Sequence, residues 1–270
     1  MQDTVITLNN VSCKAGYRYL LKNINWNVHK GEHWVVFGMN GSGKTTLLSI
    51  IAGFKHYTGG DIKVFGEPFT NENVLAFRQK IGWVSSSFFD KYYSKESALN
   101  IVLSGRNGTL GLDENITLDD VKLAKSLLAN LKLADSINKT FDMFSKGERQ
   151  NILIARALIS NPDILILDEP CTGLDVYNRS YLFNTIEKLS QNKDLTIIYV
   201  THYVEEILTL FDKILLLKNG YIFAQGAIED VFTSDRMSEL LGYPVTLEQN
   251  AVEQYSLKIE AESTITELLK

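Results

Sequence analysis

Residues Gly38 to Thr46 read Gly-Met-Asn-Gly-Ser-Gly-Lys-Thr-Thr, which matches the pattern G-x-x-x-x-G-K-[ST] in full. In this pattern the glycines let backbone N–H groups close around phosphates, and the lysine, here Lys44, reaches the β- and γ-phosphates. The hydroxyl of Thr45 is placed to bind Mg²⁺. The stretch therefore predicts a site for a nucleoside triphosphate with Mg²⁺. The residues that we expect around the phosphates are Gly38, Asn40, Gly41, Ser42, Gly43, Lys44, Thr45 and Thr46.

The flanking sequence supplies the strand and the helix that such a loop needs. His33 to Phe37 is a short apolar run typical of a buried strand. Thr45 to Ala52 has helical character and ends before Gly53, a residue that commonly follows the last helical turn. A helix N-terminus directly after a glycine loop attracts anions, because its first N–H groups have no partner within the helix.

Apolar strands alternate with helices in the second half of the chain. Asn151 to Ile159 is apolar at helical spacing, and Ile164 to Leu167 is a fully apolar run. The same pair of patterns returns in Tyr181 to Leu189 and Thr196 to Val200. This alternation predicts an α/β fold with a parallel sheet, the core of a P-loop nucleotide-binding protein.

Other patterns predict the parts that surround this core. Alternating apolar residues over Thr4 to Glu32, continued by Asp61 to Phe65, predict an antiparallel β subdomain. A strand is expected within Phe77 to Ser85, up to a run of three serines, and residues from about 88 to 143 have a helical pattern. Asn219-Gly220 between apolar runs predicts a hairpin over Ile214 to Gln225.

These patterns suggest one nucleotide-binding domain over residues 1–233, into which a helical subdomain is inserted at about 88–160. Residues 234–270 show a weaker pattern, and we expect a short helical or loosely ordered tail there. A chain of 270 residues with 45% hydrophobic content can bury a core of this size.

Composition and charge limit the classes of partner. The net charge of −5 argues against a nucleic-acid-binding surface, because Lys and Arg supply the main affinity for phosphate backbones. Cys13 and Cys171 match no metal or redox spacing, which fits a reducing cytosol. No apolar run approaches the roughly 18 residues needed to span a bilayer. We therefore expect no direct membrane insertion, and any role at a membrane requires a partner.

Two carboxylates follow the apolar strand at Ile164 to Leu167. Asp168 and Glu169 would lie at the carboxyl edge of the sheet, beside the phosphate loop, if this strand is its neighbour. Asp168 is then placed next to the Mg²⁺ held by Thr45, and Glu169 is placed to orient or deprotonate the attacking water. A strand with an ordinary polar end is the weaker alternative.

Ser145 and Glu148 form an S-x-x-E capping box before an apolar helix. The stretch Phe144-Ser145-Lys146-Gly147-Glu148 resembles the Leu-Ser-Gly-Gly-Gln signature of the ATP-binding cassette (ABC) family, and it lies in the family's order between the phosphate loop and the Asp-Glu strand. The resemblance implies that Ser145 and Gly147 touch the γ-phosphate of ATP bound to a second copy of the chain. A simple helix cap explains Ser145 and Glu148 equally well when they are considered alone.

Further landmarks of the family follow in the same order. Cys171-Thr172-Gly173-Leu174-Asp175 resembles the D-loop, which implies that Asp175 faces the dimer partner. His202 resembles the switch histidine at a strand end, which contacts the γ-phosphate and helps to hold the lytic water. Tyr17 is our choice for stacking on adenine; Tyr19 is nearly as plausible, and either is also open to plain packing in the sheet.

The sequence also departs from the family pattern. Phe144, Lys146 and Glu148 replace the usual Leu, Gly and Gln of the signature, and Glu148 would repel phosphate unless the cap holds its carboxylate back. Where the family usually ends a strand with Gln, this chain has Ser86, which reaches less far towards Mg²⁺ or water. Loss of one such polar contact costs on the order of 10² in rate. The aromatic residues that follow fit either a groove for a membrane subunit or subdomain core: Phe88, Phe89, Tyr92 and Tyr93.

Together the motifs imply an ATP-hydrolysing subunit that energises transport through a separate polytopic membrane subunit. Two chains are expected to enclose ATP and Mg²⁺, with Glu169 as general base and with His202 and Lys44 as the other catalytic residues. Thr45, Asp168 and Ser86 are the expected metal site. We expect the chain in the cytoplasm, held at the inner face of the cell membrane by its partner. The alternatives are a cytosolic ABC ATPase without a transport role and a slow nucleotide-dependent binding module.

Overall fold

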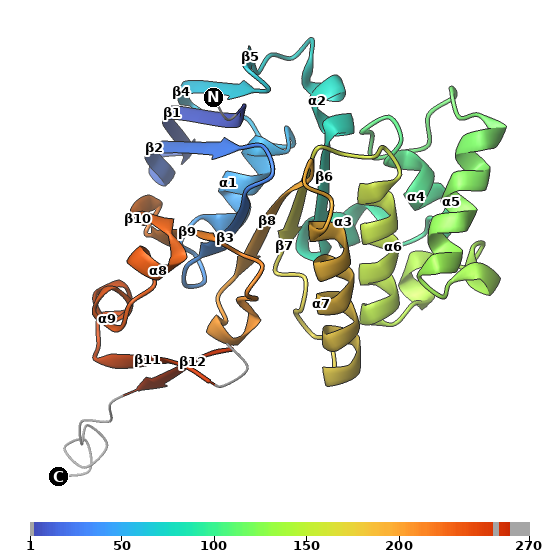
Figure 1. Ribbon diagram of the computed structural model, residues 1–270. Coiled ribbons are helices and arrows are strands. Elements are labelled where there is room, and N and C mark those ends of the chain that lie inside the picture. The colour runs from blue at the N-terminus through green and yellow to red at the C-terminus, as the bar shows by residue number, and fades with distance from the viewer. Residues whose placement is uncertain (1–2, 251–253, 260–270) are drawn as a thin grey trace.

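Two large sheets and two groups of helices build the chain in this computed structural model, which describes residues 3–250 and 254–259 (Figure 1). The α/β fold expected from the sequence is confirmed, with a parallel sheet at its centre. No helix within the described ranges is long and apolar enough to cross a membrane.

The central sheet is parallel apart from one edge strand. Its strands are β3 (His33–Phe37), β6 (Ile81–Ser85), β7 (Ile164–Asp168), β8 (Thr196–Thr201), β9 (Lys213–Lys218) and β10 (Tyr221–Ala227). The order is β10-β9-β3-β8-β7-β6, and only β10 pairs antiparallel with its neighbour. Strands β6, β7 and β8 are buried along their whole length, as apolar strands covered on both faces are. The carboxyl ends of β3, β7 and β8 therefore meet at one edge, where ligands bind in such sheets.

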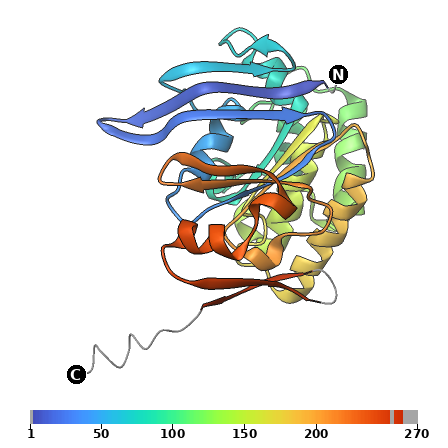
Figure 2. The ribbon, with the colours of Figure 1, turned by 60° about the vertical axis from the view of Figure 1, so that its left-hand side comes forward.

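A second, antiparallel sheet lies beside the first one. It consists of β1 (Thr4–Ala15), β2 (Arg18–His29), β4 (Gly59–Val64) and the short β5 (Glu67–Pro68), in the order β2-β1-β4-β5. Figure 2 shows β1 and β2 as two long ribbons. Trp26 of β2 meets Trp34 of β3 edge to face, with ring centroids 5.3 Å apart, so aromatic packing joins the two sheets.

Three helices lie close to the sheets. These are α1 (Lys44–Ile51) after the phosphate loop, α2 (Val74–Lys80) and, later in the chain, α7 (Val176–Ser190). The sequence pattern had placed a strand within Phe77 to Ser85; the structure begins that strand only at Ile81 and ends α2 at Lys80. The basic residues of the last turn of α2, Arg78 and Lys80, favour a helix end there.

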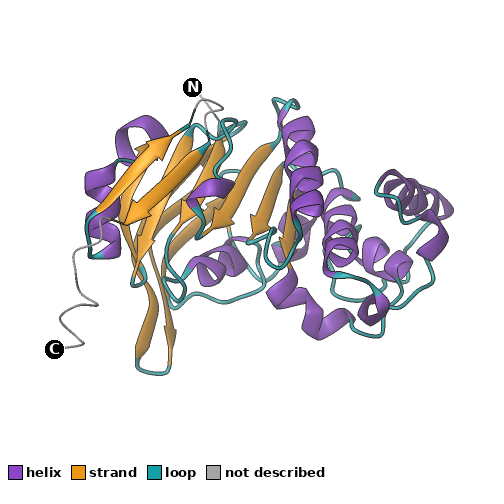
Figure 3. Ribbon diagram, turned by 90° about the horizontal axis from the view of Figure 1, so that it is seen from below, coloured by secondary structure: helices purple, strands orange, loops and turns teal. Residues whose placement is uncertain are grey.

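Most of the remaining helices gather beyond the β6 edge of the sheet. They are α3 (Ser86–Tyr93), α4 (Ala98–Ser104), α5 (Leu118–Asn130), α6 (Lys146–Leu158) and the short η1 (Ala134–Ser136) and η2 (Phe141–Met143). Helix α6 contacts both β6 and α4 and so connects this group to the sheet. Seen from below, a large group of helices without strands lies at one end of the molecule, and the strands, with a few helices beside them, lie at the other (Figure 3). The first helix of this group, α3, begins at Ser86.

The described part of the tail is more regular than expected. After η3 (Val204–Glu206) and the β9–β10 hairpin, the chain forms α8 (Ile228–Val231), α9 (Ser234–Leu241) and a second hairpin of β11 (Val245–Gln249) and β12 (Tyr255–Ile259). The hydroxyl groups of Ser234 and Ser238 accept hydrogen bonds from the backbone N–H groups of Leu247 and Val245. These bonds between α9 and β11 are tertiary contacts that a local sequence pattern does not contain. Residues 251–253 and 260–270 of the expected tail lie outside the described residues.

Candidate functional site

The phosphate loop runs from the end of β3 to the start of α1. Gly41 and Gly43 adopt φ values of 80° and 110°, which L side chains rarely adopt, so these two positions require glycine. Gly43 is also the residue that precedes α1, and no side chain caps this helix. The first N–H groups of α1 therefore have no side-chain acceptor and are free to bind an anion.

Lys44 lies buried at the centre of the loop, with only 4% of its side chain exposed. Its Nζ donates hydrogen bonds to the carbonyl oxygens of Gly38 at 2.7 Å and Met39 at 3.3 Å. It also pairs with Glu169 Oε1 at 3.2 Å. The lysine is thus held where its charge faces the loop interior, and phosphates would compete with Glu169 for it.

Asp168 ends β7 next to the loop. Thr45 Oγ1 donates to Asp168 Oδ1 at 3.4 Å, and Ser85 Oγ donates to Asp168 Oδ2 at 3.0 Å. Burial raises the pKa of Asp168 to about 6, against the effect of these hydrogen bonds. A buried carboxylate that favours its neutral form would gain from a cation beside it. Carboxylate and hydroxyl oxygens are ligands that Mg²⁺ accepts alongside phosphates and water, so Asp168 and Thr45 fit a Mg²⁺ site.

Glu169 brings three segments of the site together. Its φ of 49° lies in the left-handed region, and its N–H donates to the carbonyl of Val200 in β8 at 3.0 Å. The same Oε1 that pairs with Lys44 lies 3.1 Å from His202 Nδ1. One carboxylate oxygen is thus shared by the lysine of the loop and the histidine after β8. The sequence analysis expected Glu169 beside the phosphate loop and His202 at a strand end, and the structure places both residues there.

A cavity of about 700 Å³ lies over the loop and offers space for a nucleotide. Tyr19 lines it, whereas Tyr17 is fully exposed in the β1–β2 turn and does not. The structure therefore favours Tyr19 over our first choice, Tyr17, as the ring beside the base. Tyr17 is ill-placed because the turn at Gly16 directs it to solvent. The other lining residues are Arg18, Leu20, Asn40, Gly41, Gly43, Lys44, Thr45, Thr46, Ser87, Glu169, Asn219 and Gly220.

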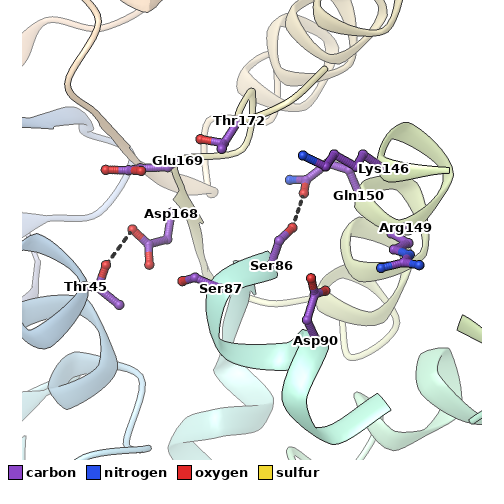
Figure 4. A pocket seen from close by; sticks show the side chains of 10 residues that line it. All are labelled: Thr45, Ser86, Ser87, Asp90, Lys146, Arg149, Gln150, Asp168, Glu169 and Thr172. Atoms are coloured by element: carbon purple, nitrogen blue, oxygen red, sulfur yellow. Dashed lines mark hydrogen bonds between the residues drawn. The ribbon is translucent and has the colours of Figure 1, made fainter. Parts of the chain in front are cut away.

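A second cavity of about 250 Å³ adjoins Thr45, Asp168 and Glu169 and extends between α3 and α6 (Figure 4). Ser86 lines it, yet the hydroxyl of Ser86 donates to Gln150 Oε1 of α6 at 2.9 Å and not to Asp168 or Thr45. Its neighbours Ser85 and Ser87 share a hydrogen bond of 3.1 Å, and Ser85 contacts Asp168. The structure does not bring Ser86 to the metal position, because Ser86 begins α3 and faces α6 there. The sequence reasoning missed Ser85, Ser87 and Gln150, whose proximity depends on the packing of α3 against α6.

The signature residues lie at the N-terminus of α6. Ser145 caps the helix: its hydroxyl accepts from the N–H of Glu148 at 3.3 Å, and Glu148 Oε2 accepts from the N–H and hydroxyl of Ser145 at 2.8 and 2.7 Å. The hydrogen bond from Ser145 lowers the pKa of Glu148, which keeps it ionised. The capping box expected from the sequence is confirmed, and it holds the Glu148 carboxylate against the helix end.

Gly147 and Asp175 lie where α6 and α7 approach each other. A Cβ on Gly147 would come 2.9 Å from the Asn178 side chain, so little room exists for any other residue. Asp175 caps α7 by accepting from the N–H of Asn178 at 2.8 Å. Ser145, Gly147 and Asp175 line neither of the two cavities beside the phosphate loop.

The aromatic run after Ser87 divides between core and surface. Phe89 and Tyr93 are buried, at 0% and 1% exposure, and Tyr93 donates or accepts a hydrogen bond with Ser104. Phe88 is partly buried and Tyr92 is exposed. Phe89 and Tyr93 are therefore subdomain core, and only Phe88 and Tyr92 remain available to a partner.

The fold and the site define a P-loop nucleotide-binding protein, with a phosphate loop after β3 and the carboxylates of Asp168 and Glu169 beside it at the end of β7. The sequence profile of the ABC transporter family matches residues 21–172. An uncharacterized ABC transporter ATP-binding protein of Bacillus subtilis (strain 168), YlmA, is 39% identical over 89% of this chain and 92% of its own length. The chain belongs to the ABC transporter family. Within that family it is an ATP-binding and ATP-hydrolysing subunit, as the motifs predicted.

More distant relatives agree with this assignment. The zinc uptake system ATP-binding protein ZurA of Listeria innocua is 31% identical over 88% of this chain and 92% of its own length. A dimeric bacterial ABC transporter cassette, solved in a post-hydrolysis state with ADP and phosphate, superposes with a TM-score of 0.71 and is 28% identical. That alignment covers 83% of this chain and 98% of the cassette.

Proposed function

We propose that this chain is the motor subunit of a membrane transporter, in which two copies enclose Mg·ATP and hydrolyse it. The observation that carries the proposal is the contact of one Glu169 oxygen with both Lys44 and His202. It places a carboxylate, a cation and an imidazole at the mouth of the phosphate loop, where the γ-phosphate of ATP would lie.

The loop would hold the triphosphate. Backbone N–H groups over Gly41 to Thr46 surround the phosphates, and Lys44 neutralises the β- and γ-phosphates. The hydroxyl of Ser42 is buried without a hydrogen-bond partner among the described residues, so it is available to a phosphate oxygen. Thr45 and Asp168 would hold Mg²⁺, which would neutralise charge that develops on the phosphates.

Glu169 would act on the water that attacks the γ-phosphorus. When the phosphates draw Lys44 away, Glu169 Oε1 becomes free to accept a proton from that water as the P–O bond to ADP breaks. His202 is already within hydrogen-bond distance of the same oxygen, so it can orient the carboxylate or contact the γ-phosphate.

The second copy would complete each site. Ser145, Gly147 and Asp175 lie at the N-termini of α6 and α7, and these three residues do not line the two cavities beside the phosphate loop of their own chain. In a head-to-tail dimer the α6 end of one chain would face the phosphate loop of the other. The dimeric cassette among the structural relatives supports such an arrangement.

A polytopic membrane subunit is the proposed partner for transport. A cavity of about 510 Å³ lies between α1 and α2 and is lined in part by Phe54, Tyr57, Phe69 and Arg78. The partly exposed Phe88 contacts Phe54 at 5.3 Å between ring centroids, which extends this aromatic surface towards α3. Such a surface suits the end of a partner helix. ZurA and the import protein PotA of Clostridium novyi support uptake as the direction, but they act on different substrates.

Substitution of Glu169 by Gln tests the hydrolytic step. Glu169→Gln should reduce ATP turnover by about 10²-fold or more, since a general base contributes 10²- to 10⁴-fold, while ATP binding persists. The trapped ATP should hold the dimer together, which size-exclusion chromatography with light scattering detects. Glu187→Gln, an exposed position on α7, is the matched control and should hydrolyse normally. Normal turnover in Glu169→Gln would remove Glu169 from the mechanism.

A further inference from the structure

Gln150 presents a buried carboxamide to the cavity beside the proposed metal site. Its side chain is 3% exposed, and Oε1 accepts the hydrogen bond from Ser86. Nε2 has no hydrogen-bond partner among the described residues. Figure 4 shows this nitrogen turned to the side of the cavity where Thr172 lies. A buried N–H group without a partner costs about 1 to 3 kcal/mol, so a native chain rarely keeps one without a use.

The cavity leads from Gln150 to the reacting end of the nucleotide. Thr45, Asp168 and Glu169 form its far wall, and Lys146 and Arg149 line it on the α6 side. An oxygen of the γ-phosphate is the group that would enter such a space, because it carries negative charge and lies next to Mg²⁺ and the base. Nε2 offers hydrogen-bond donors to this oxygen.

We propose that Gln150 donates a hydrogen bond to the γ-phosphate of ATP bound in its own chain, and that Ser86 positions the carboxamide for it. This rests on the proposed ATPase function. The family usually has a Gln at the position of Ser86, after β6. In this chain Gln150 of α6 would supply the carboxamide that is missing there. Because Ser145 begins the same helix, the contact connects the presence of a γ-phosphate in one site with the position of the helix end that faces the other chain.

The hydrogen bond between Ser86 and Gln150 gives the two residues different roles. Ser86 donates a hydrogen bond to Oε1, which orients the carboxamide and leaves Nε2 without a partner among the described residues. Ser86 therefore acts through Gln150 and does not reach the phosphate itself. Ser85 donates to Asp168 and shares a hydrogen bond with Ser87, so these two serines are separate from the pair of Ser86 and Gln150.

Gln150→Met tests the contact, since Met keeps the volume and removes the donor. Turnover should fall by about 10²-fold, the usual loss for one preorganised donor, while ATP affinity by calorimetry stays within about twofold. Gln150→Glu keeps an acceptor for Ser86 but offers no donor, so it should lose at least as much. Ser86→Ala should lose less than Gln150→Met. Gln79→Met, an exposed glutamine of α2, is the matched control. Turnover of Gln150→Met within twofold of wild type, or full activity of Gln150→Glu, would overturn the proposal.

Hydrogen exchange separates this proposal from the hydrolytic one. With Mg·ATP, but not with Mg·ADP, exchange should slow in residues 86–93 and in the first turns of α6. In Gln150→Met this difference should vanish, while protection of residues 38–46 by either nucleotide persists. The same difference in variant and wild type would contradict the role of Gln150. Absence of ATP hydrolysis by the wild type would instead contradict the proposed function. The exchange difference between Mg·ATP and Mg·ADP would then still show whether Gln150 contacts the γ-phosphate.

Discussion

Two helix N-termini of this chain have opposite designs. Helix α1 begins after Gly43, whose φ is 110°, and no side chain caps it. Helix α6 begins after Ser145, whose side chain and that of Glu148 cap each other reciprocally. The first end leaves its N–H groups without a side-chain acceptor, whereas at the second end the N–H groups of Ser145 and Glu148 are bonded within the chain. We infer that α1 can bind a phosphate without losing an internal hydrogen bond, and that a phosphate at α6 would compete with the cap between Ser145 and Glu148.

Charge follows the same division. The α1 end has the buried Lys44, a cation with carbonyl oxygens and one carboxylate around it. The α6 end has Lys146, which approaches the D-loop at Gly173, and the ionised Glu148. A phosphate is therefore attracted strongly to α1 and only weakly to α6. This difference would let one chain bind ATP before the second chain arrives.

Lys44→Ala should have the largest effect, because it removes the charge at the open helix end. We expect ATP affinity and turnover to fall by more than about 10²-fold, the scale of losing one preorganised charged contact. Isothermal titration with ATP and a phosphate-release assay measure both. Lys188→Ala, an exposed lysine of α7, should change neither. Unchanged affinity in Lys44→Ala would show that the open end of α1 is not the ATP site.

Asp168 next to α1 should make the site sensitive to pH. Its pKa of about 6 in the folded chain lies above the ordinary 3.8, so the folded state gains stability as pH falls through 6 towards 4. Ionisation at pH 7.5 then costs about 3 kcal/mol. Without Mg²⁺, Asp168→Asn should raise Tm at pH 7.5 by about 5 °C and abolish the gain on acidification. Mg²⁺-dependent turnover of the wild type should fall below about pH 6, since protons displace the metal.

A thermal melt series from pH 5 to 8, with and without Mg²⁺, checks both statements. Asp163→Asn, at a partly buried carboxylate before β7, is the control for loss of one negative charge. A wild-type Tm that does not rise between pH 7.5 and 5.5 relative to Asp168→Asn would contradict the buried charge at Asp168.

The open helix end could be predicted from the sequence, because its glycines and lysine are local in the chain. Strands β3, β7 and β8 were equally predictable, because short, fully apolar runs are typical of strands that are buried on both faces of a parallel sheet. The second cavity was not predictable. Ser86 and Gln150 are 64 residues apart, and their contact depends on how α3 packs against α6. The choice between Tyr17 and Tyr19 was not predictable either. The turn at Gly16 directs the Tyr17 side chain to solvent, and the spacing of residues in the sequence does not show this.

Glu148→Gln tests the closed helix end and should have the smallest effect. Gln keeps an oxygen for the N–H of Ser145 but removes a negative charge from the place where the second chain's phosphate is expected. The helix dipole interaction that is lost is worth about 0.3 to 1 kcal/mol, so Tm should fall by about 2 °C or less. In an otherwise Glu169→Gln background, the ATP concentration for half-maximal dimerisation should fall about threefold, as light scattering measures. Comparison with Glu148→Ala separates the charge from the cap. Ala lacks both the charge and the capping oxygen, so this variant should lose about 1 kcal/mol of stability. If Glu148→Gln weakens dimerisation instead, the carboxylate of the cap contributes to the second half of the site, and the contrast between the two helix ends is smaller than the structure implies.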